Sequence, residues 1–180
     1  MDLTEHCISS EVIAAGGMLT VKRDQVRLPN GNISYREYVM HPGAVVIVPI
    51  LPNGNVVLEK QFRYSLHQVF IELPAGKIDA GEEILITGQR ELLEETGYSA
   101  NEWITLGHQH PCIGYSNEVI YMFLARGLVS GSHQRDKDET LEVFDVNFDD
   151  CLTMIQRGQI TDGKTIIAIL LAEKYLQGST

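Results

Sequence analysis

The chain has 180 residues, enough for one well-buried domain or for one domain with a small appendage. Its composition, 44% hydrophobic and 21% charged, is that of a globular protein and argues against a wholly disordered chain. Fourteen Lys and Arg against 24 Asp and Glu give a formal net charge of −10. This charge argues against a protein surface that binds nucleic acid or an anionic membrane, since either would need a positive patch. A small anionic substrate remains compatible with this charge if a bound divalent cation reverses the local field.

The first half of the chain is predicted to form two β-hairpins. In each, two runs rich in β-branched or alternating residues enclose a turn that contains Pro, Asn and Gly, the residues that accept turn geometry most easily. The predicted strands cover residues 18–28, 33–40, 44–51 and 56–63.

The second half mixes helices with strands. Gly97 is placed to end a first helix in the left-handed conformation, and Asn147 and Gly158 are placed to begin and end a second. Strands followed by helices among further strands favour an α+β fold. The predicted helices cover residues 82–96, 148–157 and 162–176, and the predicted strands 103–110, 118–125 and 141–146.

Three glutamates on the first predicted helix carry the functional argument. Glu91, Glu94 and Glu95 stand at positions i, i+3 and i+4, so a helix places their carboxylates on one face, where they repel one another. Arg90 can reach Glu94 one turn along, but one guanidinium cannot neutralise three carboxylates. Clustered carboxylate oxygens suit Mg²⁺ or Mn²⁺.

A plainer interpretation is a solvated acidic helix face, which is common in globular proteins. The segment before the helix favours the metal site, because Gly76 and Gly81 let its backbone pass close to a ligand. Asp79 and Glu82 in that segment could also serve only as a capping box that starts the helix.

Residues 76–98 resemble the Nudix box, G-x5-E-x7-R-E-U-x-E-E-x-G-U, in which U is a bulky apolar residue. The segment matches the pattern at every fixed position, which are Gly76, Glu82, Arg90, Glu91, Leu92, Glu94, Glu95, Gly97 and Tyr98. The resemblance implies a Nudix-type α/β/α sandwich with a mixed sheet, preceded by a small N-terminal antiparallel β subdomain. It also implies a hydrolase that cleaves a nucleoside diphosphate linked to another group, with Mg²⁺ or, as a substitute, Mn²⁺.

The same resemblance implies roles for individual residues of the box. Glu91, Glu94 and Glu95 would hold the metal together with the main-chain carbonyl of Ala75, and Arg90 would orient the carboxylates.

Segments outside the box are similar to the ADP-ribose and nucleoside diphosphate sugar pyrophosphatase branch of the family. The similar segments are residues 36–44, 61–64 and 72–78, a proline past the box at Pro111, and residues 114–118. A two-residue insertion between Pro111 and Gly114 departs from the usual pattern. The branch implies hydrolysis to a nucleoside monophosphate and a sugar phosphate, which for ADP-ribose are AMP and ribose 5-phosphate.

The general base is expected on an acidic loop late in the chain, because residues 135–142 resemble the loop that carries it in the family. Glu139 is the first candidate and Glu142 the second. An ordinary solvated loop would look the same at either position.

Four residues are candidates for substrate binding. Arg63 resembles the arginine that meets the phosphates, Arg36 and Glu37 resemble residues at the nucleotide end, and Gly114 lies in the loop that resembles the family's substrate loop. The phosphate role of Arg63 is favoured over a surface ion pair, the alternative, because arginine can bind phosphate with two hydrogen bonds.

The resemblance also implies a β-strand subdomain over residues 1–42 that forms a homodimer by swapping its strands between two copies, followed by a catalytic domain over residues 43–180. Three widely spaced cysteines and an N-terminus without a cationic leader favour a cytoplasmic protein, and no run is long enough for a membrane span. The expected partners are a nucleoside diphosphate sugar and a second copy of the chain, with neither nucleic acid nor membrane.

Two other functions are considered. The first is a pyrophosphatase that prefers GDP-mannose or accepts many nucleoside diphosphate sugars. The second is a non-catalytic sensor that binds a nucleotide sugar, which would not need the three clustered glutamates.

Overall fold

The computed structural model describes residues 1–17, 19–131 and 140–178. Within these ranges the chain forms two compact units. The first comprises residues 1–43 and 110–119, and the second comprises residues 44–109 and 120–180.

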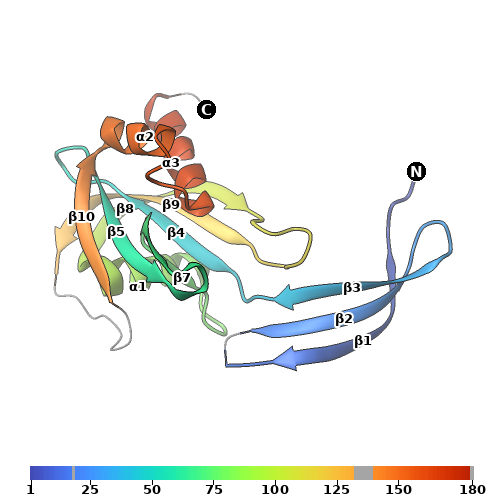
Figure 1. Cartoon of the computed structure of the whole chain (residues 1–180). Coiled ribbons are helices and arrows are strands. Elements are labelled where there is room, and N and C mark those ends of the chain that lie inside the picture. The colour runs from blue at the N-terminus through green and yellow to red at the C-terminus, as the bar shows by residue number, and fades with distance from the viewer. Residues whose placement is uncertain (18, 132–139, 179–180) are drawn as a thin grey trace. The chain divides into compact units, whose positions relative to one another are not determined.

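The first unit is built on a three-stranded antiparallel sheet in the order β1-β2-β3 (Figure 1). Its strands are β1 (His6–Ala15), β2 (Thr20–Arg27) and β3 (Ile33–Met40), so the predicted hairpin is present and β1 adds a strand that was not anticipated. Gly31 takes a φ of 86° in the turn between β2 and β3, a conformation that glycine accepts without strain. Residues 110–119 join this unit through the main chain of Val39, whose N–H donates to the Tyr115 carbonyl at 2.8 Å and whose carbonyl accepts from the Asn117 N–H at 3.3 Å.

The second unit contains two sheets, in the orders β7-β4-β9-β8 and β10-β5-β6. The second predicted hairpin is therefore wrong, because β4 and β5 belong to different sheets and the chain between them forms an isolated bridge, Ile50 to Val56. Strands β4 and β9 are parallel and every other pairing of named strands is antiparallel, so the first of these sheets is mixed. The strands are β4 (Ala44–Pro49), β5 (Asn55–Arg63), β6 (Gln68–Glu72), β7 (Ala75–Lys77), β8 (Tyr98–Gln109), β9 (Ile120–Ser130) and β10 (Leu141–Asn147), and a 3₁₀ turn η1 (Tyr64–Leu66) lies between β5 and β6.

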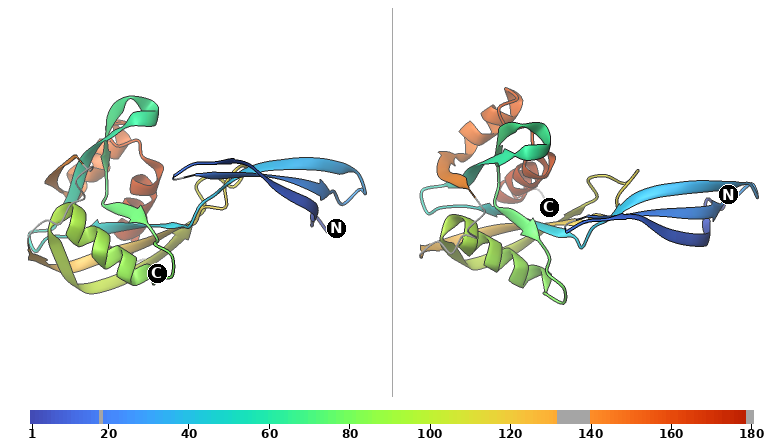
Figure 2. Two further views of the ribbon diagram at one scale, coloured as in Figure 1. Left: turned by 90° about the horizontal axis from the view of Figure 1, so that it is seen from below. Right: turned by 60° about the horizontal axis from the view of Figure 1, so that its bottom comes forward.

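Helices cover this unit from both sides, α1 (Ile84–Thr96) on one and α2 (Phe148–Gln156) and α3 (Gly163–Leu176) on the other (Figures 1 and 2). The central strand β4 is buried on both faces. Val45 and Ile47 pack with Leu92 of α1, whereas Val46 and Val48 pack with residues of β5, α2 and α3. The expected α+β class with an α/β/α sandwich and an N-terminal antiparallel sheet is therefore confirmed.

The element ends follow local chemistry in most places. Asn147 caps α2, accepting from the backbone N–H of Asp149 at 3.0 Å, and Gly97 ends α1 with a φ of 76°. Helix α1 begins at Ile84 and not at Glu82, because the backbone is still extended at its N-cap, Glu83. The short strands β6 and β7 were not predicted, since each is stabilised by pairing with β5 or β4.

Candidate active site

The centre of the candidate site is the close approach of α1 to β7. The Glu91 carboxylate lies directly over Gly76, where a Cβ atom would come within 1.9 Å of the Glu91 Cδ. Only glycine leaves room there, which explains in physical terms why a glycine opens the motif.

Two glutamates of α1 are buried at this contact. Glu91 is 8% exposed and Glu95 is 2% exposed. The Glu95 Oε2 accepts a hydrogen bond from the backbone N–H of Ala75 at 2.9 Å, so α1 is joined to the first residue of β7. Buried carboxylates need such partners, because desolvation of an unpaired charge is strongly unfavourable.

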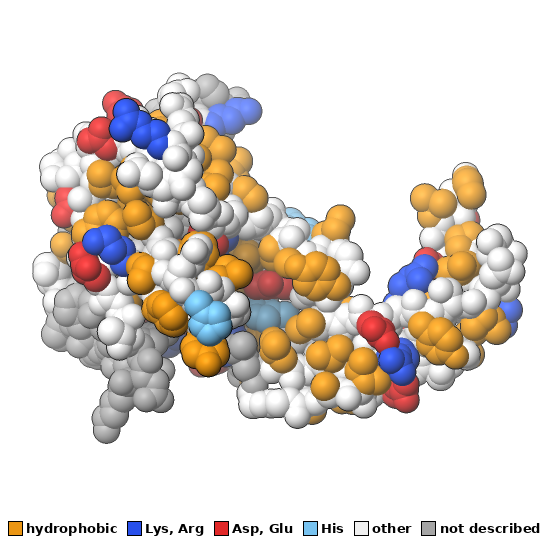
Figure 3. All heavy atoms as spheres, in the orientation of Figure 1, with side chains coloured by type: hydrophobic (Ala, Val, Ile, Leu, Met, Phe, Trp, Pro, Cys, Tyr) orange, Lys and Arg blue, Asp and Glu red, His pale blue; other side chains and the backbone are white. Residues whose placement is uncertain are grey.

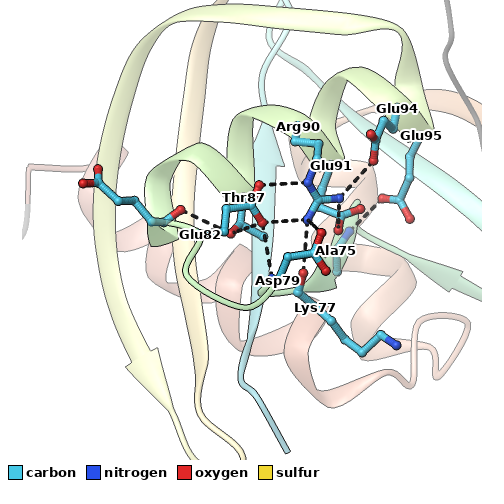
Figure 4. Close-up of polar contacts among 10 residues, drawn as sticks. Ala75, Lys77, Asp79, Glu82, Thr87, Arg90, Glu91, Glu94 and Glu95 are labelled. Carbon is cyan, nitrogen blue, oxygen red and sulfur yellow. Dashed lines mark hydrogen bonds and ion pairs between the residues drawn. The ribbon is translucent and has the colours of Figure 1, made fainter. Parts of the chain in front are cut away.

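Arg90 lies among the carboxylates of α1 and of the loop before it and binds several of them (Figure 4). Its Nε and Nη2 each donate to Glu82 at 2.9 Å, and its Nη1 donates to Glu91 at 2.8 Å and to Glu94 at 3.0 Å. Nη2 also donates to the Lys77 carbonyl at 3.2 Å. One guanidinium thus hydrogen-bonds to three carboxylates and to β7, and it also lies 4.0 Å from the Asp79 carboxylate. The expected contact between Arg90 and Glu94 is present.

From the sequence, Glu82 was identified as a fixed position of the motif and as a candidate capping residue, and its contact with Arg90 was not predicted. Its hydrogen bonds from Arg90 lower its pKa to about 2, and a bond from Thr87 adds to this effect. The same contact raises the pKa of Arg90. The only available signal was that Glu82 belongs to the fixed pattern of the motif, because the eight-residue spacing to Arg90 lies outside the range of side-chain pairs on a helix.

The donors gathered here fit a hard divalent cation. Glu91, Glu94 and Glu95 bring carboxylate oxygens, and the main chain of Ala75 and Gly76 runs against two of them. Among the described residues, no three Asp, Glu, His or Cys side chains form a ready coordination cluster, and here Arg90 and the Ala75 amide engage these glutamates. An ion would therefore compete with Arg90 for the Glu91 and Glu94 oxygens.

Arg63 lies at the end of β5, where its Nε and Nη2 each donate to Glu72 at 2.7 Å. Glu72 is buried and also binds Lys164. Burial opposes ionisation of Glu72, but the bonds from Arg63 and Lys164 outweigh it and lower the Glu72 pKa. The pairing of Arg63 with Glu72 was not predicted from the sequence.

The other predicted residues are distributed over the chain. Arg36 and Glu37 lie on β3 of the first unit, where Arg36 pairs with Glu5 and Glu37 with Arg23. Gly114 belongs to the same unit. Glu142, at the start of β10, pairs with Lys60 at 2.9 Å, and Glu139 lies outside the described residues.

Comparison with known proteins identifies the family. The model of the NUDIX domain matches residues 40–166, which include all the residues of α1 and β7 described above. The chain belongs to the Nudix family.

Near full-length relatives support this assignment to the Nudix hydrolases. The chain is 37% identical over 177 residues to the ADP-ribose pyrophosphatase of Bacillus subtilis, covering 97% of this chain and 94% of that protein. It is also 37% identical to the methanol dehydrogenase activator of Bacillus methanolicus, covering 96% and 92% of the two chains. The expected membership of this family and of its pyrophosphatase branch is therefore confirmed.

A solved structure described as an ADP compounds hydrolase has the same fold as this Nudix protein. The TM-score is 0.90 at 22% sequence identity, covering 99% of this chain and 97% of the other. Within the described ranges, none of the helices has the length and apolar character needed to cross a membrane.

Proposed function

We propose that this Nudix protein hydrolyses the pyrophosphate bond of ADP-ribose or a related nucleoside diphosphate sugar, with Mg²⁺ as its metal. The products would be a nucleoside monophosphate and a sugar phosphate. The observation that carries the proposal is the gathering of glutamates around Arg90 and β7, in a chain similar over nearly its whole length to an ADP-ribose pyrophosphatase.

In this proposal Glu91, Glu94 and Glu95 hold the ion together with the Ala75 carbonyl. The chemistry that the ion supplies when bound is neutralisation of phosphate charge and a lower pKa for a bound water. Arg90 fixes the positions of the carboxylates relative to one another. The Nε–Nη2 edge of its guanidinium binds Glu82, and Nη1 binds Glu91 and Glu94. Gly76 keeps β7 close enough to α1 for the main chain to take part.

A base must accept a proton from the attacking water. Glu139 is the first candidate for this role and Glu142 the second. Glu142 is exposed and forms an ion pair with Lys60 across β10 and β5. Breaking an exposed ion pair costs little free energy, so this contact does not prevent Glu142 from acting as the base.

The substrate would be recognised by cationic and main-chain groups. Arg63 is assigned to the phosphates, and Arg36, Glu37 and Gly114 to the nucleotide end. The ion pairs of Arg36 and Glu37 in the first unit are exposed, so both side chains could exchange partners for a ligand.

A homodimer in the cytoplasm completes the proposal. The first unit supports dimerisation, because several large hydrophobic side chains of its sheet lie exposed, including Ile8, Val12 and Ile13. The three cysteines Cys7, Cys112 and Cys151 are free thiols, which agrees with a reducing compartment.

The activity is tested by incubating the full chain and Mg²⁺ with ADP-ribose, GDP-mannose, UDP-glucose and dinucleotides. We expect release of AMP and ribose 5-phosphate from ADP-ribose, and its suppression by a chelator. Glu94→Gln removes one charge from the proposed metal site, so kcat should fall by roughly two orders of magnitude or more while the melting temperature changes little.

Glu102→Gln is the matched control, since Glu102 pairs with Arg126 on β8 and β9, away from α1. This variant should retain the wild-type rate. Unchanged turnover in Glu94→Gln at saturating Mg²⁺ would refute the metal assignment. Tight binding of a nucleotide sugar without any hydrolysis would favour the non-catalytic sensor. Preferential cleavage of GDP-mannose would make GDP-mannose, and not ADP-ribose, the substrate.

A further inference from the structure

A second group of charged side chains joins β5, β6 and α3 within the second unit. Glu72, the last residue of β6, has a side chain that is 3% exposed and binds two cations, Arg63 and Lys164. A well-packed apolar cluster is often as stable as a buried ion group of this kind. Stability alone therefore does not account for it.

The guanidinium of Arg63 is held by one edge only. Its Nε and Nη2 donate to the two oxygens of Glu72, both at 2.7 Å, which fixes the plane of the group. Among the described residues, its Nη1 has no hydrogen-bond partner, and the Arg63 side chain is 41% exposed. The buried carboxylate therefore leaves the outer donors of a fixed guanidinium available to an anion.

Glu72 is itself fixed from the opposite side by α3. Lys164 binds Glu72 and also Asp162, the N-cap of the helix, at 3.0 Å. Asp162 accepts from the backbone N–H of Thr165, and the Thr165 hydroxyl accepts from the backbone N–H of Leu73 at 2.9 Å. The carboxylate that orients Arg63 thus belongs to a network that joins β6 to α3.

This network adjoins the proposed metal site along the chain. Glu72 stands three residues before Ala75, so the two Cα atoms are on the order of 10 Å apart at most. An arginine side chain held at Glu72 and the carboxylates packed on β7 can therefore engage neighbouring parts of one diphosphate group.

We propose that Glu72 is a positioning residue that holds Arg63 by its Nε–Nη2 edge and directs Nη1 toward the diphosphate of the substrate. Lys164 keeps Glu72 in place and does not itself meet the substrate. This inference rests on the proposed function, in which Arg63 binds the phosphates.

The test compares the full chain with Glu72→Gln, Glu72→Asp and Arg63→Ala, and combines Glu72→Gln with Arg63→Ala. Titration calorimetry with Mg²⁺ measures the Kd of the methylene-bridged analogue of ADP-ribose, whose bridge cannot be hydrolysed. Steady-state kinetics with ADP-ribose measures KM and kcat separately. Glu102→Gln again serves as the control for loss of an ion pair elsewhere in the same unit.

We expect Glu72→Gln to raise Kd and KM about tenfold with kcat changed less than twofold, because the free guanidinium no longer lies in the binding orientation. Glu72→Asp keeps the buried charge but is one methylene too short to make both bonds, so it should weaken binding to a similar extent. In the Arg63→Ala background, Glu72→Gln should add no further loss.

If Glu72→Asp binds the analogue with the wild-type Kd, Glu72 only balances buried charge, and the inference is overturned. An equal loss from Glu72→Gln with and without Arg63 would overturn it too. If Glu72→Gln does not fold, Glu72→Asp alone decides between these outcomes. Wild-type protein that binds the analogue but never hydrolyses ADP-ribose would instead refute the proposed function.

Discussion

Gly76 and Glu91 share one small space, and this contact sets the distance between α1 and β7. The carboxylate occupies the position that any side chain on residue 76 would need. Helix α1 can therefore bring Glu91 and Glu95 against the main chain of Ala75 and Gly76, with Glu95 bonded to the Ala75 amide. The motif glycine is thus a steric requirement of the site.

Gly76→Ala should destabilise the protein by roughly 1–3 kcal/mol, because the new methyl group overlaps a buried carboxylate that must move. It should also abolish most of the activity, since Glu91 is displaced. Urea unfolding and the ADP-ribose assay measure the two effects.

Gly163→Ala is the control for this change. A Cβ at residue 163 meets no atom within 4 Å, and alanine restricts the unfolded chain, so stability should stay equal or rise by about 0.4–1 kcal/mol. Equal stability of Gly76→Ala and wild type would contradict the steric account.

Residue-level expectations succeeded where helical geometry governs the distance. The contact of Arg90 with Glu94 follows from the i, i+4 spacing and is present. The contacts of Arg90 with Glu82 and of Arg63 with Glu72 were not anticipated, since the first spans the loop before α1 and the second spans the turn between β5 and β6.

At the scale of elements, the start of α3 is bound to the end of β6 by one buried threonine. The Thr165 hydroxyl accepts from the Leu73 amide and donates to Asp162, while Thr165 itself is fully buried. This side chain joins Asp162, the N-cap of α3, to the residue that follows β6, so the position of α3 depends on it.

Thr165→Val keeps the shape of the side chain but leaves the buried Leu73 amide without its acceptor. The free energy of unfolding should fall by about 1–3 kcal/mol, measured by urea denaturation. Thr161→Val removes a hydroxyl from an exposed position just before the same helix and should have little effect. An equal decrease in the free energy of unfolding in both variants would show that the buried bond between Leu73 and Thr165 does not contribute more to stability than an exposed hydroxyl.

Helices were predicted more closely than strands. The ends of α2 and α3 differ from the prediction by at most one residue, because Asn147, Gly158 and Asp162 lie close to three of them. Strand β1 and the short β6 and β7 carry no comparable signal, and neighbouring strands define them.

At the scale of the whole molecule, the first unit has too little core of its own. Among its described residues, Val26 is the one hydrophobic side chain that is buried. Figure 3 shows hydrophobic side chains at the surface of the sheet β1–β3. The exposed hydrophobic residues of this sheet include Ile33 and Tyr35. A small sheet of this kind needs a further surface to cover it.

We therefore expect sedimentation equilibrium to give twice the mass of the chain at micromolar concentration. Val12→Glu places a charge on the edge strand β1, where 55% of Val12 is exposed, and should yield monomers with reduced activity. Ile167→Glu on the exposed face of α3 is the control and should remain dimeric. A fully active monomeric wild type would contradict the proposed homodimer.

The sequence by itself determined the family, the acidic face of α1 and most helix ends, because each depends on residues a few positions apart whose spacing the helical repeat or a turn converts directly into proximity. Only the tertiary structure decided that Glu91 and Glu95 are buried against β7, that Glu82 anchors Arg90, and that Glu72 meets Lys164, 92 residues later. Such contacts arise when whole elements pack against one another, and no local spacing encodes which side chains then meet.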